Sequence, residues 1–317
     1  MKELDALLVR QGAAMLEAAV KDFLALGMQV ATILDPRIGL SIEGTSILHI
    51  DGHSSPRELF DAMARDADVA LVIAPECGGA LAAWLSRLEQ LGVRSLNCEL
   101  QAARLCADKL ALAECLKGSS VPTPATSLFA TSALPDCDKR QMPLIIKPRL
   151  GAGCEETWLC ESTSDLESLP SRHDWIVQPR VPGMAASCGL IVHGPQVQSL
   201  LPGEQRIMPG RKLRYDGGRL PLPPPLAARA VALAKQAARA VPGLRGYVGV
   251  DLILGDDPTQ DMAIEINPRL TLSYVALRQL CTRSLTAAML HEDAPLAWSS
   301  GTLHFDATGR IHWEEKP

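Results

Sequence analysis

The chain has 317 residues, of which 47% are hydrophobic and 21% are charged, as in globular proteins with sizeable cores. Its formal net charge of −5 offers no global basic field, and no apolar run approaches the roughly 18 residues that a membrane-spanning helix needs. We therefore expect no nucleic-acid partner and no membrane partner. Nine cysteines without a CxxC pair, and an N-terminus without a signal-peptide pattern, predict a cytoplasmic protein with reduced thiols.

The first hundred residues alternate between extended and helical patterns. Helical spacing of apolar residues predicts a helix over 12–26, and strands are predicted at MQVATILD, SILHID and DVALVIAPE. Two more helices are predicted at SPRELFDAMARDA, which has Pro56 in its first turn, and at ALAAWLSRLEQLG. This alternation predicts an N-terminal αβ domain over 1–105, built on an open, mainly parallel sheet.

The rest of the chain predicts a second αβ unit. A helix at DKLALAECLKG precedes strands at PLIIKP, TWLC, WIVQP, CGLIVHG and VQSLLPGEQRIM. The segment 211–225 is rich in Gly, Pro and charge and predicts a loop, which either closes over an acidic substrate or stays a solvated charged loop. We expect an Ala-rich helix over 226–241, a helix near 274–290, and then a polar tail.

A hairpin is predicted where GYVGVDLIL and MAIEIN are joined by seven residues. If Leu254 pairs with Met262, Asp251 lies opposite Glu265, and Asn267 points to the same face. Facing carboxylates repel each other, so this face favours a bound cation. Such oxygen ligands suit Mg²⁺ or Mn²⁺, and because Mg²⁺ commonly keeps phosphate oxygens in its shell, a nucleotide is expected nearby. A solvent-facing acidic strand face explains the hairpin alone equally well.

Two lysines and a glycine loop add to this pattern. Lys147 ends an apolar strand just before Gly151 and Gly153, where backbone N–H groups can approach a phosphate. The loop fits neither GxxxxGK[ST] nor GxGxxG, and a plain hairpin turn with a solvent-facing Lys147 is the alternative. Lys109, at the start of a helix, is the second basic candidate, and an ordinary exposed helix lysine is its alternative.

In this order, the segments ADKLALAECLKGSSVPTP, LIIKPRLGAG, WIVQPRVPG, GYVGVDLIL and IEINPRLTLSY resemble the ATP-grasp superfamily of carboxylate–amine ligases. The resemblance runs from about residue 109 to 276. It implies a mixed α/β and α+β fold, with a pre-ATP-grasp domain followed by a two-lobed ATP-grasp fold. The small lobe would span 106–177, and the large lobe, with the metal and substrate site, would span 178–317.

The resemblance also implies a role for each matching residue. ATP phosphates would be held by Lys109, Lys147 and the loop with Gly151 and Gly153, and the adenine by a hinge of Gln178, Pro179, Arg180 and Val181. Mg²⁺ would be bound by Asp251, Glu265 and Asn267, and Arg269 would stabilise the transferred phosphoryl group. The implied reaction is attack of a carboxylate on the γ-phosphate, after which an amine displaces phosphate from the acyl phosphate.

Four segments carry a narrower resemblance: EINPRLTLSYVALR, GLRGYVGVDLIL, YDGGRLPLP and LLVRQGAAMLEAAVKDF. They are similar to the tyramine–glutamate ligase group of methanofuran biosynthesis and its relatives in C1-metabolising bacteria, which implies glutamate and an aromatic amine as small-molecule substrates. An amino-acid or peptide ligase of another pathway and a catalytically silent nucleotide-binding regulator stay open as alternatives, as does a homodimer. The sequence departs from many ATP-grasp enzymes in having no acid between Gln178 and Leu190 for the ribose hydroxyls.

Overall fold

The computed structural model describes residues 5–50, 54–129, 142–151, 154, 156–170, 174–291 and 293–316. The helices are α1 (Ala6–Ala25), α2 (Pro56–Arg65), α3 (Ala80–Leu91), α4 (Leu100–Ala107), α5 (Lys109–Gly118), α6 (Thr163–Glu167), α7 (Pro224–Ala240), α8 (Ser273–Leu280) and α9 (Leu285–Leu290). The strands are β1 (Val30–Leu34), β2 (Thr45–His49), β3 (Ser127–Phe129), β4 (Leu144–Pro148), β5 (Trp158–Cys160), β6 (Trp175–Pro179), β7 (Met184–His193), β8 (Gln196–Ser199), β9 (Gly203–Met208), β10 (Arg214–Leu220), β11 (Gly246–Leu254), β12 (Met262–Asn267), β13 (Thr302–Asp306) and β14 (Ile311–Glu315). None of the described helices is long and apolar enough to cross a membrane.

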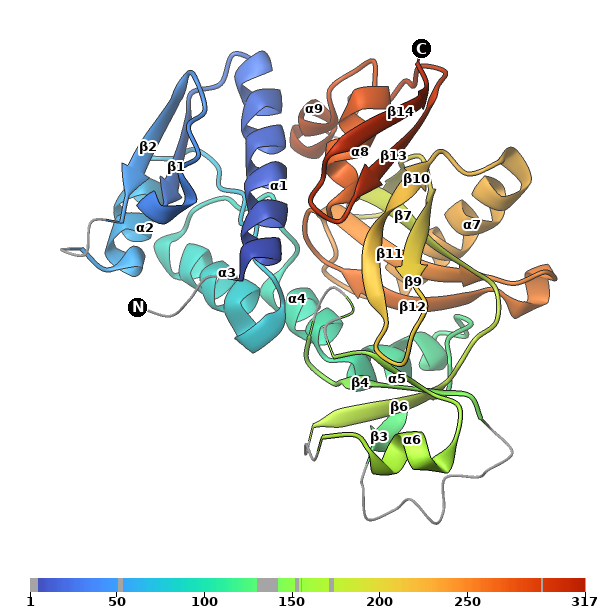
Figure 1. Ribbon diagram of the computed structural model, residues 1–317. Helices are drawn as coiled ribbons and strands as arrows, with labels where there is room; N and C mark the ends of the chain where they lie inside the picture. Colours follow the sequence, from blue (N-terminus) through green and yellow to red (C-terminus); the bar gives the residue numbers. More distant parts are fainter. Residues whose placement is uncertain are drawn as a thin grey trace.

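An N-terminal unit contains β1 and β2, which pair in parallel, together with α2, α3 and α4 (Figure 1). The predicted strand at DVALVIAPE is wrong, because residues 71–75 form no sheet ladder. Ala70 makes a single parallel bridge to Ser95, and the Asn97 side chain then takes the place of a neighbouring strand. Its Oδ1 accepts from the Val72 N–H and its Nδ2 donates to the Val72 carbonyl, both at 2.8 Å. The sheet of this unit therefore has two strands in the described part of the chain.

The large lobe is built on an eight-stranded sheet in the order β12-β11-β7-β9-β10-β13-β14, with β8 paired to β7. Its central strands are apolar on both faces, because each face is covered by helices. Leu190 and Val248 face a core with α4, α5 and α7, whereas their neighbours Ile191 and Tyr247 face a core with α1, α8 and α9. Such two-sided burial explains why β7 and β11 read as continuous apolar runs.

The small lobe is a four-stranded antiparallel sheet in the order β3-β6-β4-β5, with α6 in contact with β5. Its core contains Leu144, Ile146 and Trp175. The predicted domain boundary at 177/178 runs through β6, and the boundaries between units remain a proposal. Helix α5 lies between this lobe and the large sheet, since Leu112 and Leu116 pack into the core of the large lobe.

Three predictions for the second half of the chain differ from the structure. The segment 211–225 is not a loop, because Arg214–Leu220 forms β10, which pairs with β9 and β13. Three of its cations contact acids of this chain: Arg211 pairs with Asp165, Lys212 with Glu156 and Arg219 with Glu314. The polar tail is likewise a β13–β14 hairpin, and the helix predicted near 274–290 is divided into α8 and α9.

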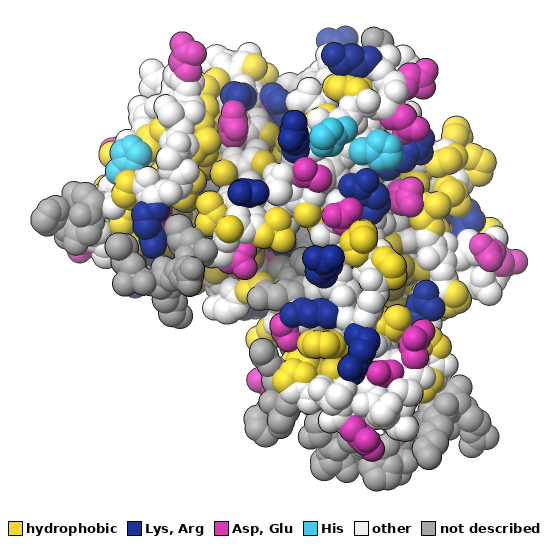
Figure 2. Space-filling view, in the orientation of Figure 1, with side chains coloured by type: hydrophobic (Ala, Val, Ile, Leu, Met, Phe, Trp, Pro, Cys, Tyr) yellow, Lys and Arg dark blue, Asp and Glu magenta, His cyan; other side chains and the backbone are white. Residues whose placement is uncertain are grey.

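A half-buried polar contact holds α1 against the large lobe. Asp22 of α1 accepts from the Arg278 Nε at 2.9 Å and from the Tyr274 hydroxyl at 2.6 Å. Hydrogen bonds to a charged group are about twice as strong as neutral ones, so this contact adds to the apolar packing of α1 on α8. On the face shown in Figure 2, Lys and Arg side chains are interspersed with Asp and Glu side chains.

Replacing Asp22 by Ala is expected to lower the free energy of unfolding by about 1 to 3 kcal/mol, because Arg278 and Tyr274 lose a shared, half-buried partner. Thermal and urea unfolding monitored by circular dichroism measure this change. Lys21→Ala on the same helix is the matched control, since the Lys21 side chain is exposed and pairs with Glu17 at the surface, and it should change stability by less than about 0.5 kcal/mol. Equal losses in the two variants would contradict the anchoring role of Asp22.

Candidate functional site

The antiparallel hairpin of β11 and β12 brings Asp251 directly opposite Glu265, as the sequence predicts. The assumed pairing of Leu254 with Met262 is wrong by one residue, because Ile253 lies opposite Met262. A bulge between Asp251 and Leu252 absorbs the difference. A β-bulge re-aims side chains locally, and here it restores the register in which the two carboxylates face each other.

Two amide side chains hold Asp251. Asn267 Nδ2 donates to Asp251 Oδ2 at 2.9 Å, and Gln205 Nε2, from β9, donates to Asp251 Oδ1 at 2.8 Å. Burial and the charge of Glu265 nevertheless raise the pKa of Asp251 to about 6. Asp251 is therefore a carboxylate whose ionised form is disfavoured in the free protein, which is the state that a bound cation relieves.

Both candidate lysines are buried beside Glu265. Lys109 is 7% exposed and Lys147 6%, so the alternative of ordinary solvent-facing lysines does not hold. Lys109 Nζ lies 2.9 Å from Glu265 Oε1 and also donates to the Gly151 carbonyl. Burial tends to raise the pKa of Glu265, but the charges of Lys109 and Lys147 lower it overall. Burial lowers the pKa of Lys147, although the charge of Glu265 works in the opposite direction.

These groups line one cavity of about 740 Å³ between the two lobes. Of the predicted site residues, Gly153 lies outside the described residues. All the others lie on the wall of this cavity: Lys109, Lys147, Gly151, Gln178, Pro179, Arg180, Val181, Asp251, Glu265, Asn267 and Arg269. At the hinge, Pro179 pairs with Leu144, and the Arg180 N–H donates to the Pro143 carbonyl at 2.8 Å. The segment from 178 to 181 thus lines the cavity from a strand end that backbone hydrogen bonds hold in place.

Arg269 has a partner that sequence reasoning missed. Its Nε lies 2.9 Å from Glu76 Oε1, and its Nη2 lies 2.8 Å from Glu76 Oε2. Glu76 is only 5% exposed and belongs to the N-terminal unit. Burial acts to lower the pKa of Arg269, but the charge of Glu76 raises it overall. The one sequence signal for Glu76 is an acid directly after an apolar run, at the end of ALVIAPE.

Further polar groups that the sequence left unassigned surround the cavity. Thr271 and Ser273 line it, and their hydroxyl oxygens lie 2.8 Å apart and within 3.3 Å of the Tyr247 hydroxyl. Glu204, on β9 opposite Ala186 of β7, also lines the cavity; it is an acid of the kind that the segment from 178 to 190 lacks. Gln11 lines the cavity as well, so α1, which packs on the large lobe, contributes to its wall.

The donor set can be compared with what Mg²⁺ requires. Among the described residues, no group of three Asp, Glu, His or Cys side chains is placed to hold a metal ion by itself. Asp251 and Glu265 offer two carboxylates and Asn267 an amide, next to two buried lysines. Mg²⁺ commonly takes one or two protein carboxylates and completes its shell with phosphate oxygens and water. The residues therefore fit Mg²⁺ together with a nucleotide phosphate.

The sequence of this chain is similar to the sequences of known ligases. Tyramine–L-glutamate ligase of Methanocaldococcus fervens is 28% identical over 211 residues, which cover 67% of this chain and 62% of that protein. The enzyme of the same name from Methanocaldococcus jannaschii is 23% identical over 86% of this chain and 79% of its own length. The match thus spans less than two thirds of the first of these relatives.

Among solved structures, an ATP-grasp superfamily protein from Archaeoglobus fulgidus matches with a TM-score of 0.74 and 24% identity, covering 96% of this chain and 88% of its own. Models of two adjoining families also match: the pre-ATP-grasp 3 domain over residues 28–103, and the ATP-grasp domain over residues 106–273. The second match covers more than half of the chain. The protein therefore belongs to the ATP-grasp family of ATP-dependent ligases, with a pre-ATP-grasp domain in front of its ATP-grasp domain.

Proposed function

We propose that this protein joins a carboxylate to an amine at the expense of ATP, through an acyl phosphate, with release of ADP and phosphate. The observation that carries the proposal is the single cavity in which Lys109, Lys147 and Arg269 surround the facing carboxylates Asp251 and Glu265. Phosphoryl transfer needs little covalent chemistry from the protein, and it depends on positioning and on neutralising charge. Cations and carboxylates fixed in one enclosed place supply both.

Each group has a defined task in this proposal. The two buried lysines hold the negative charge of the ATP phosphates, and the backbone of 178–181 packs beside the adenine, with Glu204 as the acid for the ribose. Mg²⁺, bound by Asp251, Glu265 and Asn267, would neutralise charge on the phosphate oxygens. Arg269, fixed by Glu76, stabilises the charge of the transferred phosphoryl group without having to reorganise.

We further propose glutamate as the carboxylate and an aromatic amine as the acceptor, in a pathway of the methanofuran type. Two relatives bear the name tyramine–L-glutamate ligase, which supports this substrate class. In this chain, the hydroxyls of Thr271 and Ser273 and the ring of Tyr215 line the cavity. Hydroxyl donors suit a carboxylate, and an aromatic wall suits a ring, so the lining is compatible with both substrates.

The first prediction that tests this proposed function concerns Asp251→Asn. Because the pKa of Asp251 is raised from 3.8 to about 6, its ionised form costs stability at pH 7; this cost shrinks as the pH falls through about 6 and is gone once the pH is below 3.8. A neutral amide removes the repulsion from Glu265, so the melting temperature of the ligand-free variant at pH 7 should rise by about 2 to 4 °C. Mg·ATP should raise the melting temperature of the wild type and leave that of the variant nearly unchanged.

Asp256→Asn is the matched control, since Asp256 is an exposed acid in the connection of the same hairpin. This control should keep both the ligand-free melting temperature and the Mg·ATP response of the wild type. A full Mg·ATP response in Asp251→Asn, measured by differential scanning fluorimetry, would remove Asp251 from the metal site.

The second prediction concerns turnover. With Mg·ATP, phosphate release should require both a carboxylate and an amine, and glutamate with tyramine should be the most active pair in a panel of amino acids and amines. A coupled ADP assay and mass spectrometry of the product measure this. Turnover with D-alanine or other amino-acid pairs alone would favour the peptide-ligase alternative, and no amine-dependent turnover with any pair would favour the silent nucleotide-binding protein.

The third prediction separates the two contacts of Arg269. Arg269→Gln should lower kcat by about 100-fold or more, because it removes a cation from the transition state. Glu76→Gln should lower stability by about 3 kcal/mol, because it leaves Arg269 buried without its charged partner. It should change kcat by less than about tenfold, since the guanidinium remains at the cavity. Equal losses of kcat in the two variants would show that Arg269 acts only by joining the N-terminal unit to the site.

A further inference from the structure

Helix α1 forms part of the wall of the cavity that contains Asp251, although the helix ends before residue 28, where the first matched domain begins. Gln11 and Met15 of α1 line this cavity, and Asp22 anchors the helix on α8. The spacing of residues 11, 15 and 22 follows the helical repeat, so these side chains share one face of α1. The segment LLVRQGAAMLEAAVKDF therefore presents one face to the large lobe and to the cavity.

The turn between β13 and β14 fixes the first half of α1 beside the segment 271–273. Gly309, in this turn, has a φ of +86°, and a Cβ at this position would lie 3.0 Å from the Ala14 Cβ and 3.1 Å from the Leu272 Cδ1. The segment 271–273 lines the cavity as well. Residues 11–15 and 271–273 therefore lie at the same end of the cavity.

The side-chain amide of Gln11 is bonded at one end and open at the other. Its Nε2 donates to the Ala307 carbonyl, in the same β13–β14 turn, at 2.9 Å. A backbone carbonyl only accepts, so this bond fixes which end of the amide is the nitrogen and leaves Oε1 as the acceptor. No donor among the described residues bonds to Oε1. An open acceptor on a cavity wall suits a ligand group that carries an N–H or O–H.

The charges of the cavity lie on other elements. Its acids, Glu204, Asp251 and Glu265, are on β9, β11 and β12. The described residues that line it from α1 and from 271–273 are all uncharged. A neutral acceptor can bind an ammonium group without adding negative charge, whereas an acid in its place would repel a carboxylate substrate that enters the same cavity. The α1 end of the cavity thus suits a molecule that carries both an ammonium group and a carboxylate.

We propose that Gln11 determines specificity for an amino acid as the carboxylate substrate, because its Oε1 accepts a hydrogen bond from the ammonium group of that amino acid. This inference rests on the proposed function and deepens it, since it assigns the contact that distinguishes an amino acid from a simple carboxylate. The hydroxyls of Thr271 and Ser273, at the same end of the cavity, are donors that suit a carboxylate of the same molecule.

Isothermal titration calorimetry on the full chain, with Mg²⁺ and the ATP analogue AMP-PNP present, tests this contact. The probes are pairs that differ only by the ammonium group: L-glutamate with glutarate, L-aspartate with succinate, and L-alanine with propionate. The wild type should bind at least one amino acid about tenfold or more tightly than its partner, because a hydrogen bond to a charged group is lost in the partner. Gln11→Met keeps the size of the side chain and removes the acceptor. It should reduce this ratio to about one by weakening the amino acid alone.

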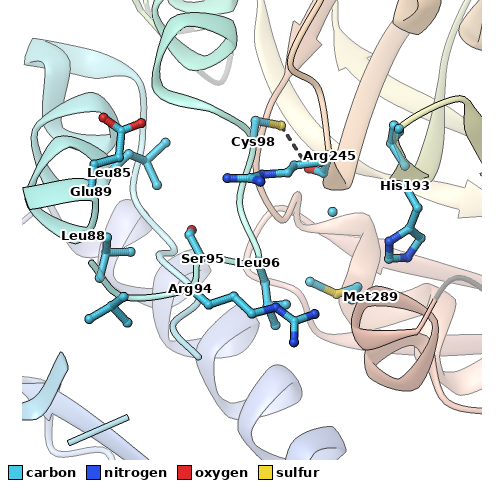
Figure 3. Close-up of a pocket in the computed structure, with 14 residues that line it drawn as sticks. Leu85, Leu88, Glu89, Arg94, Ser95, Leu96, Cys98, His193, Arg245 and Met289 are labelled. Atoms are coloured by element: carbon cyan, nitrogen blue, oxygen red, sulfur yellow. Dashed lines mark hydrogen bonds between the residues drawn. The ribbon is translucent and has the colours of Figure 1, made fainter. Parts of the chain in front are cut away.

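Arg245→Met is the matched control, because it also removes one hydrogen bond from a side chain to a backbone carbonyl. Arg245 Nε donates to the Asn97 carbonyl at 3.1 Å, beside a separate cavity of about 400 Å³ (Figure 3). No residue lines both cavities, so this variant should keep the wild-type ratio.

Four outcomes would overturn the assignment of Gln11: no binding of any of the three amino acids, a ratio near one in the wild type, an unchanged ratio in Gln11→Met, or an equal loss in Arg245→Met. The titration needs no turnover, so it can fail independently of the proposed function. A ratio that depends on Gln11 in a protein without amine-dependent turnover would support the contact and remove the ligase activity. Turnover with a ratio that does not depend on Gln11 would do the reverse.

Discussion

Two carboxylates face each other inside an apolar sheet, and much of the surrounding chain compensates for their repulsion. At a separation of a few ångströms, two like charges in a poorly solvated place repel by several kcal/mol. Asp251 receives two amide hydrogen bonds, from Gln205 and Asn267, and Glu265 receives the charge of Lys109. The asymmetry of these partners explains why the pKa of Asp251 is raised whereas that of Glu265 is lowered. The charge of Glu265 is thus offset by Lys109 and Lys147, whereas the ionised form of Asp251 stays disfavoured.

Five consecutive residues, EINPR, connect this pair to three parts of the molecule. Glu265 contacts Lys109 at the start of α5, Asn267 contacts Asp251 within the large sheet, and Arg269 contacts Glu76 in the N-terminal unit. Alternation along an extended strand puts Glu265 and Asn267 on one face, and Pro268 ends the strand so that Arg269 can turn toward Glu76. The same segment therefore carries the proposed ligands and fixes how the units meet.

The hairpin and its acidic face could be predicted from sequence, because both depend on alternation within two neighbouring strands. Glu76 could not, since its contact with Arg269 joins residues 193 positions apart and neither neighbourhood encodes the other. The segment YDGGRL was misread as a loop because glycine normally marks turns. In the fold, a Cβ at Gly217 would lie 1.9 Å from the Phe305 carbonyl oxygen, and a Cβ at Gly218 would lie 2.5 Å from that of Glu204. Those glycines permit close strand packing, which only the three-dimensional partner strands reveal.

The ion pair between Arg269 and Glu76 also affects how strongly Arg269 can stabilise negative charge in the proposed reaction. An arginine already paired with a buried carboxylate contributes less net positive field than a free one. In return, its guanidinium is held in place by contacts to both Glu76 oxygens and to the Leu270 carbonyl, so no reorganisation is needed when charge develops nearby. Preorganisation of this kind requires the N-terminal unit to stay docked. The pre-ATP-grasp domain is therefore part of the proposed active site through Glu76, which holds the guanidinium of Arg269 in place.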